Sequence, residues 1–247
     1  MVVLSKYQSG RGSDGRTERR GAIGILGGMG PEASSYLYRT LIEQSIDQYH
    51  ASDNADFPEI VLHSIPVPDF ISDASQRDAA LDMLKQRVER LDAMNLACLC
   101  IACNTVHVLL PELRGLAAAP FVSMIDEVAD RVALAGHDHV GVLGTPSTIR
   151  YGLYRDALEV RGVTAVEPDE EGLRVCERVI RHVLSGRTEA SDAADLVALA
   201  DGLLAQGAQG VVLGCTELPL VFPHGYRVPV YDSLAILSSA LLRCYYC

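Results

Sequence analysis

The chain has 247 residues, 49% of them hydrophobic, and a formal net charge of −11 with only 21 Lys plus Arg. This length and apolar content suffice for one large domain or two small ones around a packed core. The acidic balance argues against a nucleic-acid partner, which requires a basic face. No apolar run reaches the roughly eighteen residues that a membrane span needs, so no membrane partner is predicted either.

The N-terminal segment predicts a disordered tail over residues 1–21. It is polar, basic and rich in Gly and Ser, and it lacks the apolar stretch and cleavage site of a secretory signal. The chain also carries seven cysteines, an odd number. Without an export signal, free thiols in a reducing compartment are expected, and the protein is predicted to be cytoplasmic.

Short apolar strands alternate with helices from Ala22 onward. The first half predicts, in order, a strand at 22–26, a Gly-rich turn and helix at 27–48, a strand at 59–65, a helix at 79–95, and strands at 97–102 and 120–125. The second half predicts a strand at 139–144, a helix at 151–161, a long helical region at 172–204, strands at 210–214 and 229–232, and a C-terminal helix. This alternation is typical of an α/β fold with mostly parallel sheets.

Three short motifs recur in the same order at nearly the same offset. "GILG" returns as "GVLG" 117 positions later, "IACNT" returns as "LGCTE" 112 positions later, and "PFVSMID" is echoed by "PVYD" about 109 positions later. The recurrence predicts two similar α/β halves related by a pseudo-two-fold axis. We assign residues 22–120 plus 227–247 to the first domain and residues 121–226 to the second.

Two of the cysteines occupy equivalent positions in this repeat. Cys103 and Cys215 each follow an apolar strand and precede a turn. Ligands of open parallel sheets bind beyond the carboxyl ends of the strands. If the two halves face each other, both thiols approach one cleft, which is the predicted active site. Two such thiols suit proton transfer at one carbon, with a thiolate removing a proton on one face and a thiol donating one on the other.

The stretch "CLCIACNTVH" contains three cysteines with different expected roles. Cys98 and Cys100 lie within a strand, where cysteine packs as a small hydrophobe. Cys103 lies in the following turn, where a helix N-terminus would stabilise a thiolate, although a structural turn cysteine is an equal alternative. No metal site is predicted, because a fourth ligand at zinc spacing is missing and neighbouring strand residues point to opposite faces. The C-terminal "CYYC" is expected to pack or to expose simple thiols.

The turn "GGMGPEA" matches G-x-G-x-x-A at Gly28, Gly30 and Ala33, which weakly resembles a dinucleotide-binding turn. Pro31 interrupts the pattern, and the next strand lacks a clear acidic residue at its end. Backbone N–H groups of such a turn can equally bind a substrate carboxylate.

Lysine usage bears on cofactor chemistry. The chain has two lysines, Lys6 in the tail and Lys85 in a charged amphipathic helix. A pyridoxal phosphate enzyme needs a buried lysine for its Schiff base, and neither position suits. A racemase with this sequence is therefore predicted to use no cofactor.

Other polar residues near the two cysteines have two interpretations each. His107 could tune the pKa of Cys103 or be a satisfied helix histidine. Glu217 could orient its neighbours, bind a substrate amine or only complement a helix N-terminus. The remaining polar residues at strand ends could bind substrate or cap helices: Asn104, Thr105, Thr145, Ser147 and Thr216.

The motifs "GILGGMGPEAS", "CNTVH", "GVLGT" and "GCTELPL" together resemble the aspartate/glutamate racemase family, most of all its aspartate racemase branch. The wider group includes hydantoin racemases, maleate isomerases and arylmalonate decarboxylases. The resemblance implies two Rossmann-like domains, a thiol/thiolate pair, no cofactor, a small amino-acid substrate and a homodimer. It implies that Cys103 and Cys215 are the acid/base residues. It also implies that the α-carboxylate and amine are held by the turn at Met29–Gly30 with Asn104, Thr105 and Thr216.

Two positions depart from the aspartate-specific pattern. Phe70 stands where an arginine would bind the distal carboxylate, and Gly172 stands near the place of a family lysine. The distal group would then be read by another arginine (Arg77, Arg150 or Arg174), or the substrate would carry a less acidic side chain.

The sequence thus favours a cofactor-independent amino-acid racemase acting on an aspartate- or glutamate-like substrate. One alternative is an isomerase or decarboxylase of the wider group, whose members often differ at one cysteine. The other is a non-catalytic protein that binds an amino acid or a nucleotide.

Overall fold

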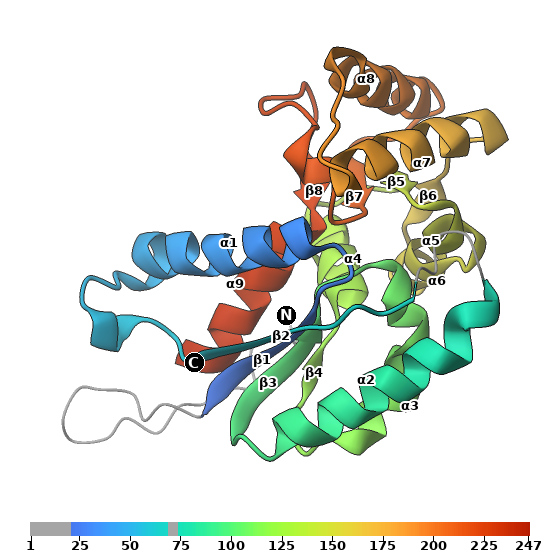
Figure 1. The fold of residues 1–247 in the computed structure, drawn as a ribbon. Helices are drawn as coiled ribbons and strands as arrows, with labels where there is room; N and C mark the ends of the chain where they lie inside the picture. Colours follow the sequence, from blue (N-terminus) through green and yellow to red (C-terminus); the bar gives the residue numbers. More distant parts are fainter. Residues whose placement is uncertain (1–20, 69–73) are drawn as a thin grey trace.

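The protein contains two four-stranded parallel sheets, each flanked by helices on both faces (Figure 1). The computed structural model describes residues 21–68 and 74–247. The first sheet has the order β2-β1-β3-β4, with β1 at Ala22–Gly27, β2 at Ile60–Ser64, β3 at Leu96–Ile101 and β4 at Phe121–Val122. The second has the order β6-β5-β7-β8, with β5 at His139–Gly144, β6 at Thr164–Val166, β7 at Val211–Gly214 and β8 at Val230–Asp232. The shared order confirms the predicted α/β fold with two similar halves.

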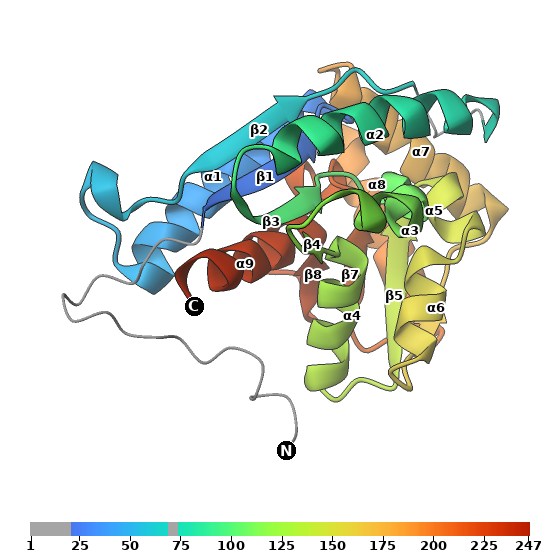
Figure 2. The same cartoon turned by 90° about the horizontal axis from the view of Figure 1, so that it is seen from below.

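The helices cover the two faces of each sheet. Their bounds are α1 Pro31–Tyr49, α2 Arg77–Asp92, α3 Leu110–Leu113, α4 Met124–Leu134, α5 Pro146–Arg150, α6 Leu153–Glu159, α7 Glu170–Leu184, α8 Ala190–Ala205 and α9 Ser233–Tyr246. Figure 2 shows α9 beside the first sheet, although it follows β8 of the second. No helix in the described part of the chain is both long enough and apolar enough to cross a membrane.

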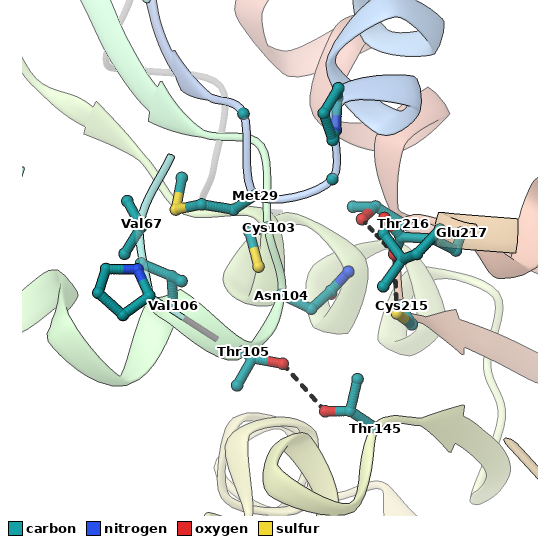
Figure 3. Close-up of a pocket in the computed structure, with 15 residues that line it drawn as sticks. Met29, Val67, Cys103, Asn104, Thr105, Val106, Thr145, Cys215, Thr216 and Glu217 are labelled. Carbon is teal, nitrogen blue, oxygen red and sulfur yellow. Dashed lines mark hydrogen bonds between the residues drawn. The ribbon is translucent and has the colours of Figure 1, made fainter. Parts of the chain in front are cut away.

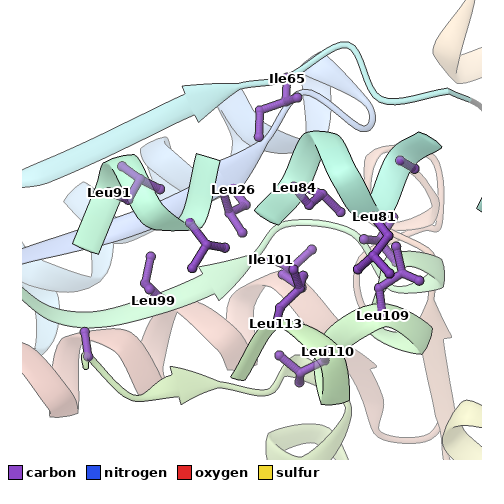
Figure 4. Close-up of a cluster of buried hydrophobic side chains, with 14 residues drawn as sticks. Leu26, Ile65, Leu81, Leu84, Leu91, Leu99, Ile101, Leu109, Leu110 and Leu113 are labelled. Atoms are coloured by element: carbon purple, nitrogen blue, oxygen red, sulfur yellow. The ribbon is translucent and has the colours of Figure 1, made fainter. Parts of the chain in front are cut away.

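The alternation of side chains along β3 separates two cores of the first domain. Leu99 and Ile101 face a cluster with α2 and α3 (Figure 4), whereas Cys98 and Cys100 face a cluster with α1 and α9. Both cysteines are fully buried. The prediction that they pack as strand residues is therefore confirmed.

Three elements differ from the sequence prediction. The strand expected at 120–125 ends at Val122, because the hydroxyl of Ser123 accepts from the N–H of Asp126 at 3.2 Å and starts α4. The helical region expected at 172–204 is two helices, α7 and α8, broken around Gly186 with φ +66°. The short strand β6 was not predicted at all.

Strand pairing also moves the proposed domain boundaries. β4 pairs with β3, so residues 121–122 belong to the first sheet. β8 pairs with β7, so residues 230–232 belong to the second, and only α9 returns to pack on α1. We therefore propose boundaries after Val122 and after Asp232.

Candidate active site

One cavity lies at the carboxyl ends of β3 and β7, between the two halves of the molecule (Figure 3). It has a volume of about 320 Å³. Its described lining comes from both domains and comprises Gly28, Met29, Gly30, Pro31, Val67, Pro68, Cys103, Asn104, Thr105, Val106, Thr145, Leu184, Cys215, Thr216 and Glu217. Nine residues that the sequence singled out are in this set, namely Cys103, Cys215, Met29, Gly30, Asn104, Thr105, Thr145, Thr216 and Glu217, whereas Ser147 and His107 are not. The volume is at the low end of the range of small-molecule sites, roughly 300–1,000 Å³, and suits a compact ligand better than a dinucleotide.

The two candidate cysteines enter this cavity from opposite domains. Cys103 follows β3, is partly buried and packs against the first-domain core. Cys215 follows β7, and its side chain is buried. In Figure 3 they lie on different walls, with Asn104 between them.

Cys215 donates a hydrogen bond from its thiol to Oε2 of Glu217 over 3.0 Å. Burial raises the pKa of the Cys215 thiol well above its ordinary value, and the nearby Glu217 carboxyl raises it further. The neutral thiol is thus the stable form of Cys215 in the unliganded protein.

Glu217 is itself a buried acid with one uncommitted oxygen. Its Oε2 accepts from both Cys215 and the hydroxyl of Thr216, the latter over 2.9 Å. Its Oε1 is buried and has no hydrogen-bond partner. A Cβ at Gly30 would lie 2.0 Å from that oxygen, so only glycine leaves room for the carboxyl group. Burial raises the pKa of Glu217.

Three threonine hydroxyls connect the domains at the cavity floor. Thr105 Oγ1 lies 2.9 Å from Thr145 Oγ1 and 3.0 Å from Thr148 Oγ1. Thr145 also caps α5 by accepting from the N–H of Thr148 over 3.0 Å. The sequence allowed Thr145 either to cap a helix or to bind substrate. It caps α5 and also lines the cavity.

Asn104 is held at both ends of its amide. Its Nδ2 donates to Ser233 Oγ over 3.2 Å, and its Oδ1 accepts from the hydroxyl of Tyr154 over 2.5 Å. Tyr154 is fully buried, and its ring occupies space that the absent side chain of Gly214 leaves free. Sequence reasoning missed Tyr154, because a tyrosine within an amphipathic helix gives no signal of a contact 50 residues away.

His107 is a satisfied structural histidine rather than a partner of the Cys103 thiol. Its Nε2 accepts from the N–H of Met124 over 3.1 Å, so its Nδ1 carries the proton and donates to the carbonyl of Cys103 over 2.8 Å. Burial lowers the pKa of His107 to about 4.

We expect His107 to make the protein less stable as the pH falls from about 6.5 to about 4, because the unfolded state binds a proton there that the folded state refuses. The integrated effect is up to roughly 3 kcal/mol of unfolding free energy. In His107→Gln the amide can supply the same donor and acceptor without titrating. Urea unfolding between pH 4 and 7 should show a shallower pH dependence in this variant, and parallel curves would contradict the expectation.

The helix expected after each cysteine is a short 3-10 segment in both cases. Thr105–Leu109 follows Cys103, and Leu218–Leu220 follows Cys215. The segment after Cys103 continues directly into α3, so a helical N-terminus does follow this cysteine. That its N–H groups and dipole stabilise a thiolate stays a prediction.

The arginines proposed for a distal carboxylate are outside the described lining. Arg77 pairs with Glu112, Arg150 pairs with Glu170, and Arg174 pairs with Glu171. Gly172 lies in the first turn of α7, where its N–H donates to Asp169. Phe70 lies outside the described residues.

A group of potential metal ligands in the described ranges lies elsewhere, at the connection between α7 and α8. It consists of His182, Glu189 and Asp192. The Asp192 carboxylate already binds Nδ1 of His182 at 3.0 Å and the N–H of Glu189 at 2.7 Å, as part of a helix cap. These contacts account for the cluster as local structure.

Comparison with known proteins gives one consistent match. The family model described as Asp/Glu/Hydantoin racemase matches residues 26–241. The broad specificity amino-acid racemase RacX of Bacillus subtilis (strain 168) is 24% identical over 227 residues, covering 90% of this chain and 97% of that protein. An aspartate racemase homologue from Pyrococcus horikoshii OT3 has a TM-score of 0.76 at 29% identity, covering 90% of this chain and 97% of that one. The aspartate racemase of Picrophilus torridus has a TM-score of 0.76 at 26% identity, covering 90% and 94%.

Proposed function

The chain belongs to the Asp/Glu/hydantoin racemase family of isomerases, and we propose that it is an amino-acid racemase in which Cys103 and Cys215 exchange the α-proton. The observation that carries the proposal is that two thiols from equivalent strand ends of two similar domains line one small cavity. Inversion of a stereocentre needs an acid and a base on opposite faces of one carbon.

The hydrogen bond from Cys215 to Glu217 suggests which thiol acts first as the acid and which as the base. Cys215 is a neutral thiol that donates to Glu217, so it is the proton donor for the first turnover. Cys103, the less buried of the two, acts in that direction as the thiolate base. Cys103 takes the α-proton, the carbanion is protonated by Cys215, and the two residues end with exchanged protonation states.

Glu217 would make the second half of this exchange possible. When Cys215 gives up its proton, a thiolate remains next to the carboxyl group that had accepted its hydrogen bond. A protonated Glu217 can donate to that thiolate, whereas an ionised one would repel it. The raised pKa of Glu217 favours the protonated form and so supports this role.

We propose that backbone N–H groups and threonine hydroxyls lining the cavity bind the substrate. The α-carboxylate and amine would be held by backbone groups at Met29–Gly30, with hydroxyls of Thr105, Thr145 and Thr216. Asn104 would act mainly by positioning, because its amide already binds Tyr154 and Ser233. Lys85 is not among the described lining residues, so a Schiff base with it is not part of the proposal.

We expect the protein to exchange the α-proton of at least one amino acid with D₂O and to convert either enantiomer to the racemate. Proton NMR measures the exchange, and chiral chromatography measures the products. Aspartate and glutamate, which the family resemblance favours, belong in the panel beside neutral and basic amino acids. Turnover of maleate or an arylmalonate without amino-acid exchange would instead support an isomerase or decarboxylase. Light scattering would test the homodimer that the resemblance also implies.

A further inference from the structure

We infer that the side-chain end of this cavity recognises a neutral, apolar amino-acid side chain rather than a carboxylate. The inference rests on the proposed racemase function and specifies its substrate class. The walls of the cavity beside the two sulfurs differ in chemical character.

The wall around Cys103 is apolar. Met29, Val67 and Val106 gather there, on the side of Cys103 that faces away from Cys215 (Figure 3). All three belong to or pack against the first-domain core that also supports Cys103. Pro68 and Leu184 add further apolar lining. A side chain that leaves the α-carbon toward this wall would contact carbon and sulfur atoms and would gain from burial of apolar surface.

A carboxylate in the same place would have no cationic partner among the described lining residues. The set contains no Arg, Lys or His, and its one ionisable carboxyl group is that of Glu217. Burial of an ion without a partner is strongly unfavourable, and the negative net charge of the chain adds long-range repulsion.

Two arginines at the α7–α8 connection line a different hollow. Arg181 and Arg187 line a shallow surface there, and Leu184 is the residue that it shares with the cavity. Neither arginine is among the described lining residues of the cavity.

A basic side chain is disfavoured for the opposite reason. It would need an acceptor on the apolar wall, but the single carboxyl group of the lining is on the Cys215 side. There Glu217 already accepts from Cys215 and Thr216, and its free oxygen faces Gly30. The walls thus fit an aliphatic or thioether side chain of moderate size.

The test compares kcat/KM for racemisation of methionine, leucine and norvaline with aspartate, glutamate and lysine. We expect the neutral substrates to exceed the charged ones by roughly 100-fold, the cost of burying an unpaired charged group. Val67→Arg should raise turnover of glutamate and lower that of methionine, each by roughly 10-fold or more. Val160→Arg is the matched control, because Val160 is 85% exposed and outside the cavity.

Equal or faster wild-type turnover of aspartate, glutamate or lysine overturns the inference and leaves the racemase proposal intact. An unchanged substrate ranking in Val67→Arg overturns it as well. A binding measurement separates the two proposals: ligand-detected NMR with L-methionine and L-glutamate needs no turnover. Preferential binding of L-methionine without exchange of any amino acid supports the side-chain class and rejects racemisation, whereas preferential binding of L-glutamate rejects the side-chain class.

Discussion

Cys103→Ala and Cys215→Ala are each expected to lower kcat/KM for racemisation by roughly 10³-fold, because each removes the acid or base from one face of the α-carbon. The expected effect of the two substitutions together is close to that of either alone, since a racemase with one thiol already lacks a complete pathway. Chiral chromatography of both reaction directions measures the loss.

The matched control is Cys244→Ala. Cys244 is also a partly buried thiol, but its sulfur donates to the carbonyl of Ala97 at the far end of β3. This variant should keep wild-type turnover. Full activity in both single variants at Cys103 and Cys215 would rule out the two-thiol mechanism, whatever the fold.

Gly30→Ala is expected to be the next most damaging change. A methyl group would lie 2.0 Å from Glu217 Oε1, and the backbone φ of +74° is unfavourable for alanine. Strain of this kind costs roughly 1–3 kcal/mol of unfolding free energy. In addition, displacement of Glu217 would break the hydrogen bond from Cys215 and lower kcat by roughly 100-fold.

Gly225→Ala is the control that separates the backbone strain of a positive φ from the steric contact with Glu217. Gly225 has the same φ of +74°, but no atom would lie within 4 Å of its new Cβ. It should therefore lose stability without losing activity. Introducing Gly30→Ala into a Glu217→Ala background tests the contact directly, because the methyl group then has space. An equal cost of Gly30→Ala in both backgrounds would show that its contact with Glu217 is unimportant.

Periodicity and repetition explain what the sequence could predict. Position within the predicted strand separated Cys98 and Cys100 from Cys103 in the following turn, and burial of the first two confirms that they pack as strand residues. The repeat placed Cys103 and Cys215 at equivalent strand ends, and both line the same cavity. These patterns are local or strictly periodic, so they can be read along one chain.

The features that the sequence did not predict depend on distances across the fold. The contact of Tyr154 with Asn104 and the exclusion of a side chain at Gly30 by Glu217 join segments that are far apart in the chain. The 3-10 form of the first helical turns after each cysteine was not predicted either, because a turn of α-helix and a turn of 3-10 helix share the same starting pattern. The apolar wall around Cys103 was not predicted either, because Met29, Val67 and Val106 are far apart in the sequence and meet only in the folded protein.

The path of α9 has a consequence for how the protein matures on the ribosome. Leu234, Leu237 and Leu241 of this helix complete the core against α1 and β3 of the first domain, although the helix is synthesised after the whole second domain. Until α9 emerges, this face of the first sheet is covered by α1 alone. The second domain, whose strands all precede α9, can close its sheet earlier. The first domain, although synthesised first, is thus completed last, and the part of its core that α9 covers stays open to a chaperone until then.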